Sequence, residues 1–119
     1  MDILLVDDDQ KQLDALVEVL EERGYELRTA SDGRAALEHI AARVPELVIS
    51  DVQMPRMDGI TFLQVVQERF PDVPVVLMTG AGDETDSGAA FEYGARGFLH
   101  KPIRLDAFLA GIRRIEKAL

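Results

Sequence analysis

Apolar residues in this chain fall into five short runs that alternate with segments of helical periodicity. The first run, residues 3–6, is apolar at every position, which is typical of a strand covered by helices on both faces. The other predicted strands lie at residues 27–30, 47–50, 73–78 and 98–100. Strands that alternate with helices along a chain favour a parallel sheet, so the pattern predicts an α/β domain.

The helical segments follow each apolar run. In the first, apolar residues recur every three or four positions from 13 to 20, and Gly24 supplies a stop. The other predicted helices lie at residues 36–41, 60–70, 85–93 and 105–119. We expect the segment 85–93 to form the least stable helix, because Gly88 lies inside it and its apolar residues are mostly small. The apolar stripe of the last helix comprises Leu105, Phe108, Leu109, Ile112 and Leu119.

Composition narrows the possible partners. The length of 119 residues suits one domain, and we expect residues 1–119 to form it. A net charge of −9 argues against direct nucleic-acid binding, which depends on clustered Lys and Arg. The chain has no cysteine, and the apolar run after Asp2 is too short for a signal peptide or membrane span. We therefore expect a soluble, cytoplasmic domain that contacts neither nucleic acid nor membrane.

Side chains that could react or bind a ligand lie at the ends of four of the predicted strands. Asp7 and Asp8 follow the first strand, Asp51 the third, Thr79 the fourth and Lys101 the fifth. In parallel α/β sheets, ligands bind beyond the carboxyl ends of the strands, at the point where the chain changes direction across the sheet. The distribution fits a five-stranded parallel sheet of order 2-1-3-4-5, in which these side chains converge.

Three carboxylates in one place repel each other unless a cation neutralises them. Because the candidate ligands are all oxygens, Mg²⁺ is favoured over zinc. Lys101 supplies a charge suited to a phosphoryl group, and Thr79 supplies a hydroxyl donor. The set predicts phosphoryl transfer to an aspartate nucleophile. We assign that role to Asp51, which stands alone, whereas Asp7 and Asp8 form a pair suited to holding metal.

Four motifs carry these residues in order along the chain. They are Val6-Asp7-Asp8, the segment Asp51 to Gly59, Met78-Thr79-Gly80 and the segment Phe98 to Pro102. Each motif alone is weak evidence, but the ordered set resembles the receiver domain of two-component response regulators over essentially the whole chain. The resemblance implies a doubly wound, flavodoxin-like (βα)5 fold. Thr79-Gly80 with Phe98-Leu99 resembles the receivers of nitrogen- and dicarboxylate-responsive transcription activators.

The resemblance implies how the acceptor and the metal are arranged. A histidine kinase or phosphotransfer protein would phosphorylate Asp51 to give an acyl phosphate. Mg²⁺ would be held by Asp8, Asp51 and the backbone carbonyl of Gln53, and by Asp7 mostly through water. The domain would then be a phosphoacceptor with self-phosphorylation and self-dephosphorylation chemistry, rather than an enzyme that turns over other substrates.

The resemblance also implies a conformational switch. Lys101 would pair with the phosphoryl group, Thr79 would move to hydrogen-bond it, and Phe98 would turn inward behind Thr79. The face formed by the fourth helix, fifth strand and fifth helix would change. It would then control a C-terminal output domain of a longer regulator or a downstream protein, or form a phosphorylation-dependent homodimer. Gln53 and Ala81 occupy positions that tune self-dephosphorylation in the family.

Other functions share parts of this pattern. A haloacid-type phosphatase also uses an Asp nucleophile and Mg²⁺, but normally carries a second Asp two residues later, where this chain has Gln53. A flavin-binding module needs a hydroxyl-rich phosphate loop after its first strand, where residues 7–9 would repel phosphate. A receiver-like domain without phosphorylation is disfavoured by the intact set of Asp8, Asp51, Thr79 and Lys101.

Residues beside the motifs receive structural interpretations. Asp9 is predicted to cap the first helix, because it lies where that helix begins. The resemblance implies a cis peptide bond before Pro102. His39 and His100 are assigned surface or structural roles, although His100 adjoins Lys101 and could tune it.

Overall fold

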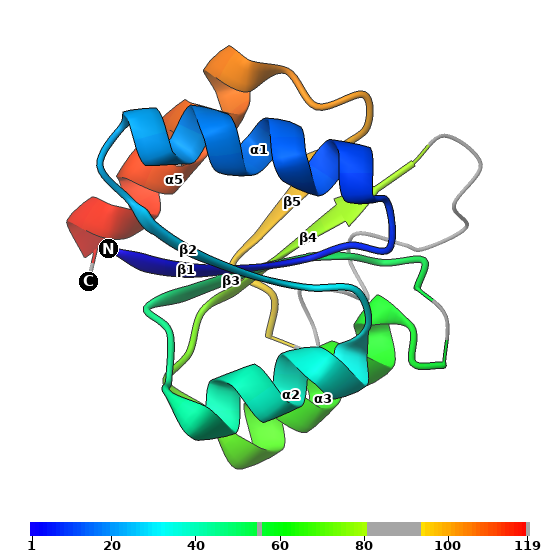
Figure 1. The fold of residues 1–119 in the computed structure, drawn as a ribbon. Coiled ribbons are helices and arrows are strands. Elements are labelled where there is room, and N and C mark those ends of the chain that lie inside the picture. Colours follow the sequence, from blue (N-terminus) through cyan, green and yellow to red (C-terminus); the bar gives the residue numbers. More distant parts are fainter. Residues whose placement is uncertain (55, 81–93, 119) are drawn as a thin grey trace.

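The computed structural model describes residues 1–54, 56–80 and 94–118, and five parallel strands form one sheet (Figure 1). The strands are β1 (Asp2–Val6), β2 (Glu26–Ala30), β3 (Leu47–Asp51), β4 (Val75–Thr79) and β5 (Gly97–His100). The helices within the described residues are α1 (Gln10–Glu22), α2 (Gly33–Ala42), α3 (Gly59–Arg69) and α5 (Leu105–Ala118). The order β2-β1-β3-β4-β5 confirms the predicted topology. The predicted helix at 85–93 lies outside the described residues, as does Ala81.

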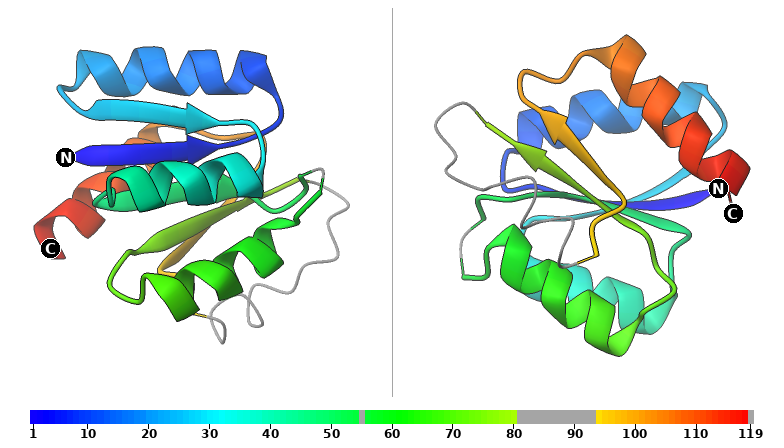
Figure 2. Two further views of the ribbon diagram at one scale, coloured as in Figure 1. Left: turned by 60° about the horizontal axis from the view of Figure 1, so that its bottom comes forward. Right: turned by 180° about the vertical axis from the view of Figure 1, so that it is seen from behind.

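The sheet lies between two layers of helices. Figures 1 and 2 show α1 and α5 on one face and α2 and α3 on the other. Side chains alternate along β1, so Ile3 and Leu5 pack against α1 and α5, while Leu4 and Val6 pack under α2 and α3. All four side chains are fully buried. This two-sided burial explains why the first strand is apolar at every position.

Aspartates start three of the helices at the carboxyl edge of the sheet. The carboxylate of Asp9 accepts hydrogen bonds from the backbone at the start of α1, as predicted, and Asp32 and Asp58 do the same for α2 and α3. After α1, Gly24 adopts a left-handed conformation with φ of 88° that ends the helix. The short connections from strand to helix place these helices directly beside the strand ends.

Two predicted details were wrong at the ends of elements. β4 begins at Val75, not Val73, because Pro74 has no N–H to donate to the ladder. Leu105, predicted in the apolar stripe of the last helix, is 48% exposed. It is the first residue of α5, one turn before Phe108, where burial of that helix begins.

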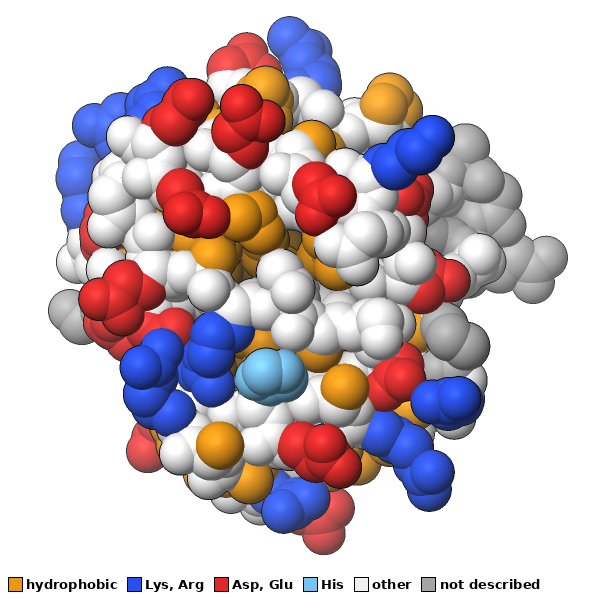
Figure 3. Space-filling model, in the orientation of Figure 1, with side chains coloured by type: hydrophobic (Ala, Val, Ile, Leu, Met, Phe, Trp, Pro, Cys, Tyr) orange, Lys and Arg blue, Asp and Glu red, His pale blue; other side chains and the backbone are white. Residues whose placement is uncertain are grey.

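The surface carries charges of both signs. On the face seen in Figure 3, acidic side chains lie among small groups of Lys and Arg, with apolar atoms visible between them. No helix in the described part of the chain combines the length and apolar character needed to cross a bilayer.

Candidate functional site

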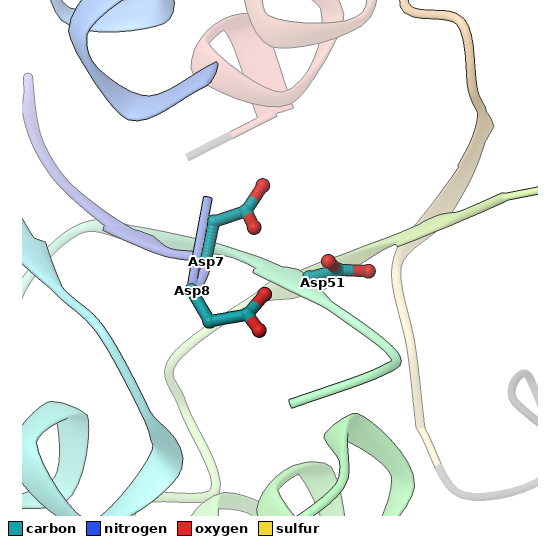
Figure 4. Close-up of side chains that lie close together, drawn as sticks. All are labelled: Asp7, Asp8 and Asp51. Atoms are coloured by element: carbon teal, nitrogen blue, oxygen red, sulfur yellow. The ribbon is translucent and has the colours of Figure 1, made fainter. Parts of the chain in front are cut away.

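The carboxyl ends of β1 and β3 bring three carboxylates together. Asp7 and Asp8 directly follow β1, and Asp51 is the last residue of β3, the neighbouring strand. Each residue offers an oxygen within 4.8 Å of the others, and Figure 4 shows the side chains gathered at this edge. Asp7 and Asp51 are buried, whereas Asp8 is exposed. The cluster could therefore hold a metal ion that is partly open to solvent.

Lys101, which follows the edge strand β5, adds a cation to this cluster. Its Nζ lies 2.9 Å from Oδ2 of Asp51 and 3.7 Å from Oδ2 of Asp7. The backbone N–H of Lys101 donates to the carbonyl of Thr79, which fixes the end of β5 against β4. The peptide bond between Lys101 and Pro102 is cis, in agreement with the expectation from the motif.

Burial and charge shift the proton affinity of two groups. Burial raises the pKa of Asp7 to about 6, and the negative charge of Asp51 also raises it, although the backbone N–H of Asp9 and the charge of Lys101 oppose the shift. Burial lowers the pKa of Lys101, but the hydrogen bond to Asp51 and the charge of Asp7 outweigh burial and raise it overall. Asp7 therefore ionises less readily than a free aspartate, even with the ammonium group of Lys101 nearby.

The surroundings of one carboxylate oxygen indicate whether a metal ion would fit in the cluster. Oδ2 of Asp7 is buried and accepts no hydrogen bond from the described residues. A buried acceptor without a hydrogen bond is costly, and a coordinated cation would reduce that cost. An open cavity of about 530 Å³ lies beside the cluster, lined by Asp8, Asp9, Asp51, Gln53, Met54 and Lys101. All-oxygen ligands with room for water fit a hard divalent cation such as Mg²⁺.

The connection from β3 to α3 is held close beneath the site. The backbone N–H of Gln53 donates to Oδ1 of Asp51 at 3.3 Å, and the N–H of Gly59 donates to the carbonyl of Val52 at 2.7 Å. A Cβ atom on Gly59 would lie 2.5 Å from the carbonyl oxygen of Asp51. Gly59 therefore allows α3 to start against the backbone of the proposed acceptor.

Thr79 occupies the end of β4, with 3% of its surface exposed. Its hydroxyl lies 3.3 Å from Nδ1 of His100, the residue opposite it in the register of β4 and β5. The ring of His100 also contacts that of Phe98, with centroids 5.6 Å apart and planes tilted by 59°. Thr79, Phe98 and His100 thus form a second group of contacts beside the carboxylates.

Comparison with known proteins identifies the family. Residues 3–113 match the family model of the response regulator receiver domain. The chain belongs to this family. The receiver domain of NtrX from Brucella abortus has the same fold, with a TM-score of 0.93 and 33% identity over 99% of this chain and 100% of that one.

Longer regulators contain similar receivers. The nitrogen assimilation regulatory protein NtrX of Azorhizobium caulinodans is 38% identical over 99% of this chain and 26% of its own length. The C4-dicarboxylate transport transcriptional regulatory protein DctD of Pseudomonas aeruginosa is 38% identical over 94% of this chain and 24% of its own length. This receiver therefore spans about a quarter of these relatives, and the predicted resemblance to nitrogen and dicarboxylate regulators is confirmed.

The structure of the receiver places most of the predicted residues in two groups. Asp7, Asp8, Asp51 and Lys101 converge, and Gln53 lines the same cavity. Thr79 and Phe98 lie with His100, which sequence reasoning left as a surface or structural residue. A signal for His100 was present in the sequence, because a residue two positions after Phe98 lies on the same face of a strand.

Proposed function

We propose that this receiver is a phosphoacceptor switch in which Asp51 accepts a phosphoryl group from a histidine kinase or phosphotransfer protein. The main support is the position of Lys101 Nζ, 2.9 Å from Asp51 and beside the carboxylate cluster, at the mouth of an open cavity. A carboxylate with a cation and further oxygen ligands around it is suited to phosphoryl transfer.

The transfer can be written with this chain's groups. An oxygen of Asp51 attacks the phosphorus of a phosphohistidine, an O–P bond forms, and the P–N bond breaks with its electrons passing to the imidazole. Lys101 keeps a positive charge beside the attacking carboxylate. Asp8, Asp51 and the carbonyl of Gln53 would hold Mg²⁺, with Asp7 acting through water. When bound, the ion neutralises negative charge on the carboxylates and the phosphoryl group.

We propose that the conformational change after phosphorylation begins with the hydroxyl of Thr79. After transfer, Thr79 would hydrogen-bond the phosphoryl group and Phe98 would turn inward behind it. The change would reach the face that includes β5 and α5, which contacts an output domain, a downstream protein or a second copy of the chain. The lengths of NtrX and DctD, about four times that of this chain, support an output domain.

In this function the domain itself is phosphorylated and dephosphorylated, and it does not turn over other substrates. We propose that it is not an enzyme for other substrates, because Gln53 stands where haloacid-type phosphatases carry a second Asp. We also propose that residues 1–119 act as one domain in the cytoplasm, and the similarity to the DNA-binding transcriptional regulator NtrC of Escherichia coli supports this location. The net charge of −9 supports a role without direct DNA contact.

Intact mass after incubation with acetyl phosphate and Mg²⁺ tests the proposal. The wild-type chain should gain the mass of one phosphoryl group, and Asp51→Asn should gain none. Asp58→Asn is a matched control, because Asn also caps helices, so α3 should be preserved and labelling should occur. Unchanged wild-type mass, or labelling that survives Asp51→Asn, would overturn the proposal. Many turnovers of a small phosphomonoester would favour the phosphatase instead.

A further inference from the structure

The hydroxyl of Thr79 lies toward β5, on the flank of β4 opposite to the strand that carries Asp51. In the sheet, β4 lies between β3, which carries Asp51, and β5, which carries His100. The hydroxyl of Thr79 is within hydrogen-bond distance of His100 Nδ1, at 3.3 Å. A phosphoryl group on Asp51 would lie toward β3, on the opposite flank of β4 from His100, so we expect Thr79 to leave His100 when it hydrogen-bonds that group.

His100 touches both residues that the proposed switch moves. It lies two positions after Phe98 on the same face of β5, and their rings are in tilted contact. Phe98 is half-buried and packs against the core beneath α2 and α3. A rotation of Phe98 inward therefore removes the ring on which His100 rests, at the same time as Thr79 is withdrawn from its Nδ1.

We propose that His100 is a positioning residue that holds Thr79 in the resting orientation and thereby opposes activation. This inference rests on the proposed function, since it assumes that Asp51 carries the phosphoryl group. Binding of that group competes with the contact between Thr79 and His100. The equilibrium constant for switching is consequently reduced by the stability of this hydrogen bond.

The expected size of the effect follows from the exposure of His100. The Thr79 hydroxyl is buried, but the His100 side chain is exposed, so the hydrogen bond lies at the weak end of the usual range of net strengths. Loss of such a bond should shift the switching equilibrium by about two- to fivefold. The same factor should appear in the affinity for any ligand that binds only the switched state.

Substitutions at His100 separate the polar contact from the ring contact. His100→Phe keeps a ring against Phe98 and removes Nδ1. His100→Asn removes the ring and keeps a polar atom at the same distance from the backbone as Nδ1. We expect His100→Phe to release Thr79 and His100→Asn to retain it, whereas a residue that only packs against Phe98 would show the opposite ranking. His39→Phe on α2 is the matched control, away from both groups of site residues.

The measurement is titration of the magnesium-loaded chain with beryllium fluoride, a phosphoryl mimic, followed by the amide NMR signals. His100→Phe should bind about two- to fivefold more tightly than wild type, with His100→Asn and His39→Phe close to wild type. Thermal unfolding of each variant establishes that it is folded, and His100→Ala serves as a second release variant.

Two results would overturn the inference alone. One is an affinity for beryllium fluoride equal to that of wild type in both His100→Phe and His100→Ala. The other is a gain in affinity in His100→Asn as large as that in His100→Phe. Failure of the wild-type chain to bind the mimic and to be labelled at Asp51 would instead overturn the proposed function, and the inference with it. The labelling experiment on Asp51→Asn therefore distinguishes the two failures.

Discussion

Asp7 is the most constrained acidic residue of the site. Its side chain is fully buried, one oxygen accepts the backbone N–H of Asp9, and the other accepts no hydrogen bond from the described residues. Lys101 lies 3.7 Å from that second oxygen. A carboxylate placed this way lowers the stability of the metal-free fold, which is the usual consequence of building a charged binding site in advance of its ligand.

The raised pKa of Asp7 gives the first prediction. Because the folded chain binds this proton more tightly than the unfolded chain, the contribution of Asp7 to stability should fall as pH rises from about 4 to about 6 and stay lower above it. In EDTA, Asp7→Asn should then be more stable than wild type by about 3 kcal/mol at neutral pH, and by much less near pH 4.

Urea unfolding at the two pH values measures this difference. Asp72→Asn, an exposed substitution, should change stability little at either pH. A metal-free Asp7→Asn variant that is no more stable than wild type at neutral pH would contradict the prediction.

Individual site residues differed in how far sequence could predict them. The meeting of Asp7, Asp8, Asp51 and Lys101 was predictable, because the ends of parallel strands share one edge and strand order fixes their neighbours. The contact between Thr79 and His100 was not predicted, because it depends on register and side-chain direction. The sequence gives the residue types, but only the packed sheet determines which atoms of two neighbouring strands meet.

The connection between β3 and α3 shows how an element positions the acceptor. Arg56, in a left-handed conformation with φ of 70°, places its guanidinium 3.2 Å from Asp32 at the start of α2. Gly59 starts α3 against the carbonyl of Asp51. The connection is therefore held against the start of α2 at Arg56 and against the end of β3 at Gly59, and Gln53, near its start, lines the cavity.

Gly59→Ala should destabilise the domain by about 1–3 kcal/mol, because the added methyl group would overlap backbone atoms of residues 51 and 52, which cannot rotate away. The control is Gly111→Ala in α5, where the nearest atom to the new methyl group is a flexible Arg114 nitrogen at 4.0 Å. That change should stabilise by up to about 1 kcal/mol.

Urea unfolding compares the two variants with wild type. Equal stability of Gly59→Ala and wild type would show that the β3–α3 connection can shift without cost, contrary to the prediction.

The positions of elements were predictable to within a few residues, and their ends less so. Short apolar runs identified the strands, and helical spacing identified the four helices that the structure describes. The errors at Pro74 and Leu105 arise at element ends, where hydrogen-bonding capacity and distance from the core, rather than apolar pattern, decide the outcome.

For the whole molecule, negative charge concentrated at one sheet edge predicts stabilisation by divalent cations. A ligand that binds only the folded state stabilises it by an amount that grows with concentration, about 2.7 kcal/mol at a hundredfold excess over Kd. We expect Mg²⁺ to raise the melting temperature progressively, EDTA to reverse the rise, and Asp8→Asn to weaken it. Differential scanning calorimetry measures these shifts.

Sodium chloride at matched ionic strength controls for general screening of the net charge of −9. An equal rise with sodium chloride, or an undiminished response in Asp8→Asn, would count against a metal site in this cluster.

The arrangement of strands also sets the order in which the site can be completed during synthesis. Asp51 is on the central strand, but the lysine beside it follows β5, which pairs with β4 at the edge of the sheet. A growing chain released as far as α3 already contains all three carboxylates and still lacks their cation. The last strand to emerge thus supplies the group beside the proposed acceptor, and an unfinished chain offers a signalling partner only part of the site.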